Sequence, residues 1–287
     1  MITFEKVSKN YQGSPEILQN INLEILSGEL VFVTGPSGAG KTTLALETAT
    51  SLAKHLDKKV LLVDANFSAP NIALSLDLTK AYVLQDVLHQ GTLPQNAIYE
   101  AHGIDIIPSS MHYHKEIDPH KLKKILQKYK SRYDFIILDT SPNYEELKPI
   151  IAASDKIFLV TSPDHVTLHT TLKAARIAKE QKTPIEGIII NKIRSPKHEY
   201  NLKEIETLSE VPVLAKIKDH KKMAEALHSK TPISVLDELN TISKEIKNFA
   251  AAIAGSPKKE GWFQKLLPYK PFVPKEEVNR QFYSSQV

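Results

Sequence analysis

The 287-residue chain contains no cysteine, so it has no disulfide, no thiolate metal site and no cysteine nucleophile. It also lacks any apolar run close to the roughly 20 residues that a membrane-spanning helix needs. No signal-peptide pattern is visible at its N-terminus. The hydrophobic content of 41% and the charged content of 24% are typical of an ordinary globular domain. We therefore expect a cytoplasmic protein with a sizeable core.

The chain also has little net charge. The formal net charge is +4, and residues 255–287 account for +3 of it, with six basic and three acidic side chains. The rest of the chain is close to neutral. We therefore do not expect this part of the chain to bind nucleic acid, because a nucleic-acid-binding surface carries a concentrated positive charge.

One motif is present in full. Residues 35–42 read GPSGAGKT and fit the pattern G-x-x-x-x-G-K-[S/T], between an apolar run at 30–34 and a helix-forming run at 43–49. In that setting backbone N–H groups surround phosphate oxygens, a lysine reaches the outer phosphates and a hydroxyl binds Mg²⁺. We predict ATP or ADP with Mg²⁺ as the ligand. The residues predicted to contact it are Gly35, Pro36, Ser37, Gly38, Ala39, Gly40, Lys41, Thr42 and Thr43.

Strand-like and helix-like segments alternate after this motif. Apolar, β-branched runs occur at 59–64, 103–108, 133–139, 156–161, 185–190 and 211–217. Helical periodicity fills gaps between them, for example at 119–130, 165–181 and 235–254. This pattern predicts an α/β fold of the P-loop NTPase kind, with a doubly wound, mainly parallel sheet and helices on both of its faces.

The chain divides into three parts. Residues 1–29 contain two strand-like runs, at 2–7 and 17–26, and predict an antiparallel β-hairpin at the sheet edge. Residues 30–254 form the nucleotide-binding domain. Residues 255–287 contain four prolines and are predicted to be a tail outside the core. The opening residues 2–11 resemble those of ABC-transporter ATPases, which implies that Tyr11 stacks on adenine; a tyrosine that only packs in the hairpin is the alternative.

Two aspartates end apolar strands on the same sheet edge as the phosphate loop. They are Asp64 in VLLVDANF and Asp139 in FIILDTSP. Carboxylates at this place can hold Mg²⁺ directly or through water, together with Thr42. An aspartate after a strand can also cap a helix or close a turn. The pair following a phosphate loop favours the metal role.

These segments together resemble the MinD/ParA family of P-loop ATPases. The matching pieces are VLLVDANFSAPNIALSLDL, YVLQDVL, AIYE, IDIIPSS, YDFIILDTSP, KIFLVTSPD, IEGIIINKIR and VPVLAKI, in order over about residues 30–254. The resemblance is to the MinD-like branch. It implies that Asp64 assists Mg²⁺, that Asp139 is the Walker B-type aspartate and that Asn191 recognises adenine. It also implies that Pro212 and Val213 line the base pocket, because we expect these two residues to follow the last strand.

Two residues depart from the family pattern. The family usually has a second lysine near the start of the phosphate loop, which reaches the nucleotide across a dimer, and here Pro36 stands there. The family also has Asp-x-Asp after the second strand, whereas here Asn66 replaces the later aspartate. Asn66 can hold a water molecule but cannot accept its proton. With Lys41, Asn66 and Asp139 as catalytic candidates, we expect slow or partner-stimulated hydrolysis.

The tail contains one amphipathic segment, at 257–267. Four large apolar residues lie on one face at helical spacing, with Lys259 and Lys265 on the polar side, and prolines bound the segment. The segment resembles the C-terminal membrane-targeting helix of MinD proteins. Docking on the protein's own core or on a partner is the alternative. The residues predicted to enter the membrane are Trp262, Phe263, Leu266 and Leu267.

Taken together, these patterns predict an ATP-dependent switch. It would form a homodimer with ATP, attach peripherally to the inner face of the cell membrane and position a protein partner, in cell division or in placing a surface appendage. Two alternatives remain. One is an ATP-dependent scaffold that does not hydrolyse ATP. The other is an energy-coupling ATPase like those of ABC transporters, although the chain has neither an LSGGQ-like signature nor an Asp-Glu Walker B pair.

Overall fold

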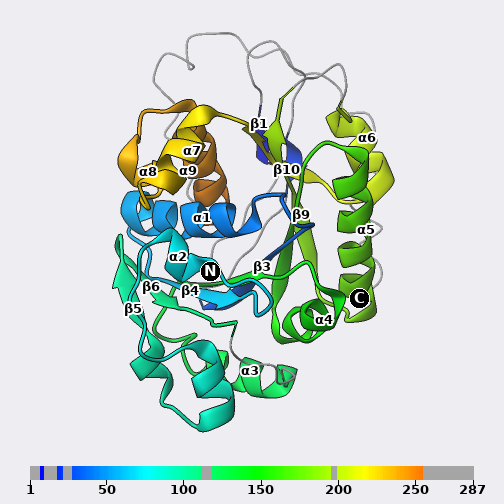
Figure 1. Ribbon diagram of the computed structural model, residues 1–287. Helices are drawn as coiled ribbons and strands as arrows, with labels where there is room; N and C mark the ends of the chain where they lie inside the picture. Colours follow the sequence, from blue (N-terminus) through cyan, green and yellow to red (C-terminus); the bar gives the residue numbers. More distant parts are fainter. Residues whose placement is uncertain (1–6, 10–17, 22–27, 112–117, 195–198, 255–287) are drawn as a thin grey trace. The chain divides into compact units, whose positions relative to one another are not determined.

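A computed structural model describes residues 7–9, 18–21, 28–111, 118–194 and 199–254 (Figure 1). Tyr11 and the tail segment 257–267 lie outside these residues, so both predictions about them remain predictions. In the described part of the chain, no helix combines the length and the apolar character needed to cross a bilayer.

The domain is organised around an eight-stranded sheet whose strand order is β10-β9-β8-β3-β7-β4-β6-β5. Neighbouring strands run parallel except β5, which pairs antiparallel with β6. This confirms the predicted doubly wound, mainly parallel sheet. The strands are β3 (Glu29–Thr34), β4 (Val60–Ala65), β5 (Tyr99–Ala101), β6 (Ile104–Ile107), β7 (Phe135–Thr140), β8 (Lys156–Thr161), β9 (Ile185–Ile193) and β10 (Val213–Lys218).

Helices cover both faces of this sheet (Figure 1). One layer holds α1 (Lys41–Leu56), α7 (Lys221–His228), α8 (Ile233–Leu236) and α9 (Thr241–Ile253). The other holds α3 (Pro119–Gln127), α4 (Tyr144–Ala153), α5 (His165–Glu180) and α6 (Leu202–Ser209). Three short elements lie between strands: α2 (Ile72–Ser75), the π-helical turn Asp86–Gln90 and the 3₁₀ turn Pro94–Ala97.

The central strands are buried because they have helices on both sides. Every residue of β4 and of β7 is buried, which explains why the first four residues of each strand are all apolar instead of alternating with polar ones. On the α1 side, Phe158 of β8 meets Phe249 of α9 edge to face, with ring centroids 5.6 Å apart. This packing fixes the carboxyl ends of β3, β4 and β7, where the site residues lie.

The predicted N-terminal hairpin is seen in its described residues: β1 (Val7–Lys9) and β2 (Leu18–Ile21) pair antiparallel as a two-stranded sheet. One helix boundary differs from the predicted one. The single helix predicted over 235–254 is wrong at its start, because α8 ends at Leu236 and α9 begins at Thr241. The Asn240 side chain accepts the Ile242 N–H and so sets the new start.

A buried carboxylate joins α1 to α8. Glu47 is 2% exposed, and its Oε1 accepts the Ile233 N–H at 2.6 Å. Its Oε2 accepts the Ser234 N–H at 3.1 Å and the Ser234 hydroxyl at 2.7 Å. Burial raises the pKa of Glu47, and the three hydrogen bonds oppose that rise. Glu47 therefore caps α8 from a different helix.

We predict that Glu47→Ala lowers the free energy of unfolding by about 2–4 kcal/mol, because buried donors at the start of α8 lose their acceptor. Urea unfolding of the nucleotide-free protein measures the change. The matched control is Glu180→Ala at the exposed end of α5, expected within about 0.5 kcal/mol of the unsubstituted chain. Equal effects of the two substitutions would contradict the capping role.

Candidate nucleotide-binding site

The phosphate loop joins β3 to α1 and requires glycine at two places. A Cβ at Gly35 would lie 1.9 Å from the Val160 carbonyl oxygen of β8, so only glycine fits there. Gly40 has a φ of 85°, in the left-handed region, and a Cβ there would lie 2.4 Å from the Asn191 side-chain nitrogen. The loop is thus held closely between the ends of β8 and β9.

Lys41, the first residue of α1, is enclosed by this loop. Its ammonium group donates to the Pro36 carbonyl at 2.9 Å, and the residue is 6% exposed. Burial lowers the pKa of Lys41, while the charge of nearby Asp139 opposes the change. An ammonium group held inside the loop by a neutral carbonyl is available to exchange that contact for a phosphate oxygen.

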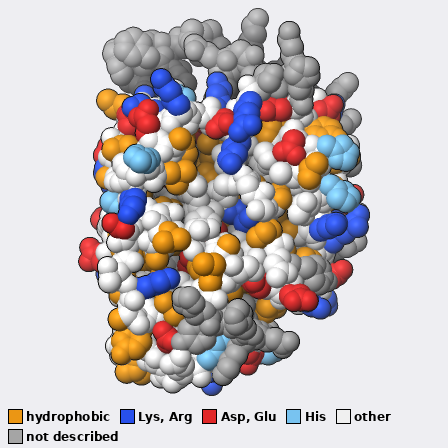
Figure 2. Space-filling model, viewed as in Figure 1, with side chains coloured by type: hydrophobic (Ala, Val, Ile, Leu, Met, Phe, Trp, Pro, Cys, Tyr) orange, Lys and Arg blue, Asp and Glu red, His pale blue; other side chains and the backbone are white. Residues whose placement is uncertain are grey.

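A pocket of about 570 Å³ opens beside the loop. Figure 2 shows a shallow hollow near the middle of this face of the molecule, where acidic and basic side chains are interspersed. The polar lining suits a charged ligand more than an apolar one. The residues that line the pocket are Ser37, Gly38, Gly40, Lys41, Thr42, Thr43, Asn66, Ser68, Ala69, Asn71, Ser75, Ser141, Pro142, Asn143 and Lys192.

The two predicted metal-site aspartates lie side by side at the bottom of the site. Asp64 of β4 and Asp139 of β7 are partners in the parallel register, and both are fully buried. Burial, then the charge of Asp139, raises the pKa of Asp64 to about 8. Burial raises the pKa of Asp139 to about 6, against the Thr42 hydrogen bond and the charge of Lys41. A nearby cation would relieve both costs.

Asp139 and Thr42 fit Mg²⁺. The Thr42 hydroxyl donates to Asp139 Oδ2 at 2.6 Å, and Asp139 Oδ1 is buried with no hydrogen-bond partner among the described residues. A hydroxyl and a carboxylate with a free oxygen are ligands that Mg²⁺ prefers. Asp64 has a second task, since its two oxygens accept the N–H groups of Asn66 at 3.2 Å and Ile72 at 3.1 Å. It therefore also holds the loop that follows β4.

Asn66 is placed by that loop and lines the pocket. Its side-chain oxygen accepts the Ala69 N–H at 3.2 Å. The next turn is tied to α4, because Glu146 accepts the N–H groups of Phe67 at 3.1 Å and Ser68 at 3.2 Å. The structure thus brings Asn66 to the phosphate loop, as its predicted role requires, and supports it from two elements.

Asn191 also contacts the loop. Its side-chain amide donates to the Ala39 carbonyl at 2.8 Å from the carboxyl end of β9. The placement of Pro212 and Val213 after the last strand is wrong. Val213 begins β10 and pairs with Ile188 of β9, which is level with Leu159 of β8 and, through it, with Thr34 at the end of β3. The role of the two residues in the base pocket stays a prediction. The residues that follow β10 at the site's edge are Asp219 and His220.

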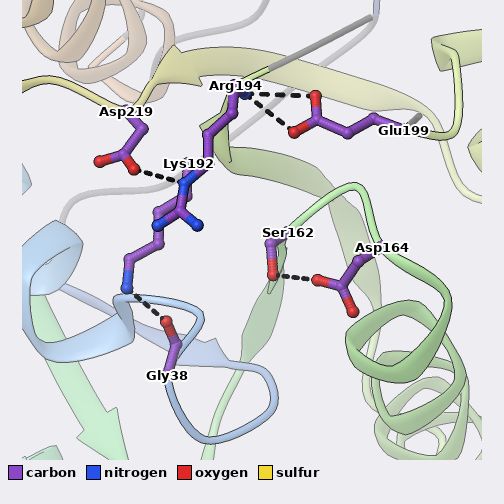
Figure 3. A network of polar contacts seen from close by, with 7 residues as sticks. All are labelled: Gly38, Ser162, Asp164, Lys192, Arg194, Glu199 and Asp219. Carbon is purple, nitrogen blue, oxygen red and sulfur yellow. Dashed lines mark hydrogen bonds and ion pairs between the residues drawn. The ribbon is translucent and has the colours of Figure 1, made fainter. Parts of the chain in front are cut away.

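Sequence reasoning missed several lining residues. Ser68, Asn71, Ser141 and Asn143 lie in the loops after β4 and β7, where any residue near the motif's aspartates is a candidate. Lys192 was missed although it directly follows Asn191. Its ammonium group donates to the Gly38 carbonyl at 2.7 Å, as Figure 3 shows. In a regular strand adjacent side chains point to opposite faces, so the sequence pattern did not indicate it.

Residues 30–233 match the CobQ/CobB/MinD/ParA nucleotide binding domain family. The chain belongs to this family. The match begins in β3 and ends at the start of α8, so it includes the phosphate loop, both aspartates and Asn191. This confirms the predicted membership of the MinD/ParA family of P-loop proteins.

Individual relatives agree with this membership. An ATP-binding protein of Methanocaldococcus jannaschii is 28% identical over 250 residues, which cover 83% of this chain and 94% of that protein. The septum site-determining protein MinD of Thermotoga maritima is 27% identical over 244 residues, covering 79% and 89%. MinD of Pyrococcus horikoshii, solved with Mg-ADP, has a TM-score of 0.71 at 23% identity, covering 78% and 95%. That last likeness shows the shared fold.

We predict that Asp139→Asn stabilises the nucleotide-free protein at pH 8 by about 1–3 kcal/mol, because it removes a buried charge that lacks a full set of partners. The folded-state pKa of about 6 lies above the 3.8 of an unperturbed aspartate, so the cost of this charge grows as pH rises through that interval. The gain should therefore shrink at pH 5.

Thermal unfolding at the two pH values, with and without Mg-ADP, measures this. Mg-ADP should raise the unfolding temperature of the unsubstituted chain more than that of the variant. Asp57→Asn, at an exposed helix end, is the matched control and should change neither quantity. A variant that is less stable than the unsubstituted chain at pH 8 would contradict the prediction.

Proposed function

We propose that this protein is a MinD-type switch ATPase that binds ATP with Mg²⁺, dimerises around the bound nucleotide and attaches reversibly to a membrane in order to position a partner complex. The observation that carries the proposal is the contact between Thr42 of the phosphate loop and Asp139, whose second oxygen is buried without a partner in the described part of the chain. The MinD relatives, named for septum placement, support cell division as the process.

Each site residue has a distinct task in this proposal. Backbone N–H groups of the loop and the Lys41 ammonium group bind the phosphates. Thr42 and Asp139 would hold Mg²⁺, and the bound ion would neutralise charge on the phosphates. Asp64, which lies beside Asp139, would assist them. Asn191 contacts the adenine edge, for which an amide supplies both a donor and an acceptor. Asn66 orients the attacking water.

Hydrolysis should be slow. Asn66 offers an amide where an aspartate would offer a charged acceptor, and its oxygen already accepts the Ala69 N–H. Pro36 contributes neither a charge nor an N–H group, so the loop cannot extend a cation to a partner subunit from that position. These two residues also favour a second candidate function, an ATP-dependent scaffold that does not hydrolyse ATP.

Membrane attachment is assigned to residues 257–267. Each apolar side chain that enters a bilayer contributes about 1.5–3 kcal/mol. Each adjacent lysine adds about 1 kcal/mol at an anionic surface. A helix this short is marginal in water, so one copy binds weakly. Two copies in an ATP-bound dimer act together through their effective concentration, which couples attachment to the nucleotide.

We predict that Asn66→Asp increases ATP turnover by about tenfold or more, because a carboxylate can accept a proton from water and stabilise developing charge. Phosphate release with Mg-ATP measures it. Asn96→Asp makes the same chemical change at an exposed position outside the pocket lining and should leave turnover unchanged. No increase in Asn66→Asp, or an equal one in the control, would favour the scaffold function.

We predict that anionic vesicles sediment the full chain more strongly with ATP than with ADP or no nucleotide. A form that ends at Ala254 should stay in the supernatant in all three conditions. A full chain carrying Trp262→Asp and Phe263→Asp should behave like the shortened form, because charge on the apolar face opposes insertion. Equal sedimentation of all forms would reject the membrane switch.

A further inference from the structure

We propose that Lys192 is a phosphate-binding residue, and that it supplies from β9 the second cation that Pro36 cannot supply from the loop. This inference rests on the proposed nucleotide-binding function and names one more residue of the same site. Lys192 lines the pocket, and its ammonium group lies 2.7 Å from the Gly38 carbonyl at the exposed tip of the phosphate loop.

An irregularity in β9 produces this placement. Lys216 and Lys218 of β10 pair with Ile190 and Ile193 of β9, so one more residue lies on β9 than on β10 between these two pairs. Such a bulge re-aims side chains. It allows two consecutive residues, Asn191 and Lys192, to contact the loop from the same side at 2.8 Å and 2.7 Å.

The backbone at Lys192 is held in an unfavourable conformation. Its φ of 58° lies in the left-handed region, which costs a non-glycine residue energy. Glycine would adopt this conformation more readily and would preserve the bulge. The left-handed conformation at Lys192 is thus part of the local irregularity of β9 that places its side chain beside the phosphate loop.

The surroundings leave the charge of Lys192 available. Figure 3 shows two acidic side chains of this region engaged with Arg194: Asp219 accepts from its guanidinium group, and Glu199 accepts its backbone N–H. Within the described ranges, Lys192 forms no ion pair with any acidic side chain. An ammonium group has three donors, so a carbonyl contact leaves two for a phosphate oxygen.

Lys192 and Lys41 are arranged alike. Lys41 donates to the Pro36 carbonyl from inside the loop, and Lys192 donates to the Gly38 carbonyl from its outer side. Both hold an ammonium group against a neutral oxygen at the place where phosphates are expected. A triphosphate carries several negative charges, and a second cation beside the loop would bind it more tightly than Lys41 alone.

Calorimetry with ATP and ADP, and competition with adenosine, tests the assignment in the full chain. Lys192→Met should weaken ATP and ADP binding by about tenfold, while adenosine binding stays unchanged. Lys192→Arg should stay within about threefold of the unsubstituted chain. Lys192→Gly should lose the same affinity without lowering the unfolding temperature, which separates ligand binding from a structural role. Lys124→Met, on the exposed side of α3, is the matched control and should change nothing.

Two results would overturn the assignment of Lys192 without affecting the proposed function. One is unchanged ATP and ADP affinity in Lys192→Met, and the other is a loss of adenosine affinity equal to the loss of ATP and ADP affinity. The latter would mean that Lys192 shapes the loop or the base pocket. If the unsubstituted chain bound neither ATP nor ADP, the proposed function would fail, and the assignment with it. The control of Lys41→Met separates these cases, because it should abolish nucleotide binding only where the loop is the binding site.

Discussion

The burial of two neighbouring carboxylates is the constraint on which the rest of the site depends. Asp64 and Asp139 lie in register on adjacent parallel strands, and both have a raised pKa in the absence of a cation. Water cannot relieve this repulsion, because helices cover both faces of the sheet. Lys41 opposes it only in part, since burial also disfavours its own charge. A divalent cation beside the two carboxylates, as the proposed function requires, would relieve this cost. Affinity for that metal and stability of the fold would then be set by the same pair of residues.

The irregularity in β9 determines which further side chains reach the phosphate loop. A regular β9 would direct Asn191 and Lys192 to opposite faces. The bulge between the pairs at Ile190 and Ile193 brings both to the phosphate loop. The loop itself has a proline where relatives of this kind usually carry a lysine. A cation delivered from β9 acts within one subunit, whereas a lysine in the loop acts across a dimer. In the proposed dimer, association would then depend less on a lysine that contacts the nucleotide of the other subunit. It would depend more on the surfaces that surround the two sites.

Much of the fold could be predicted from the sequence, because apolar strands and amphipathic helices leave strong periodic patterns. The phosphate loop and the two aspartates follow from local motifs, so their residues were identified correctly as neighbours. Other features depend on contacts that no local pattern reveals. The bulge at Lys192 arises from pairing with β10, and the start of α9 depends on the Asn240 cap. Pro212 and Val213 were misplaced because the apolar run VPVLAKI does not show where its strand begins; the strand starts at Val213, so the two residues lie at its start and not after its end.

The α1 layer links the nucleotide to the end of the domain. Helix α1 begins at Lys41 inside the phosphate loop, and six residues later Glu47 accepts hydrogen bonds from the start of α8. Helix α9 begins five residues after α8 ends and packs on α1, and its Phe249 packs on Phe158 of β8. The proposed membrane segment begins a few residues after α9 ends at Ile253. A displacement of α1 on nucleotide binding would therefore be passed to α8 by a buried, hydrogen-bonded carboxylate, which resists sliding more strongly than apolar packing does. One helix and the buried Glu47 therefore connect the phosphate loop physically to α8.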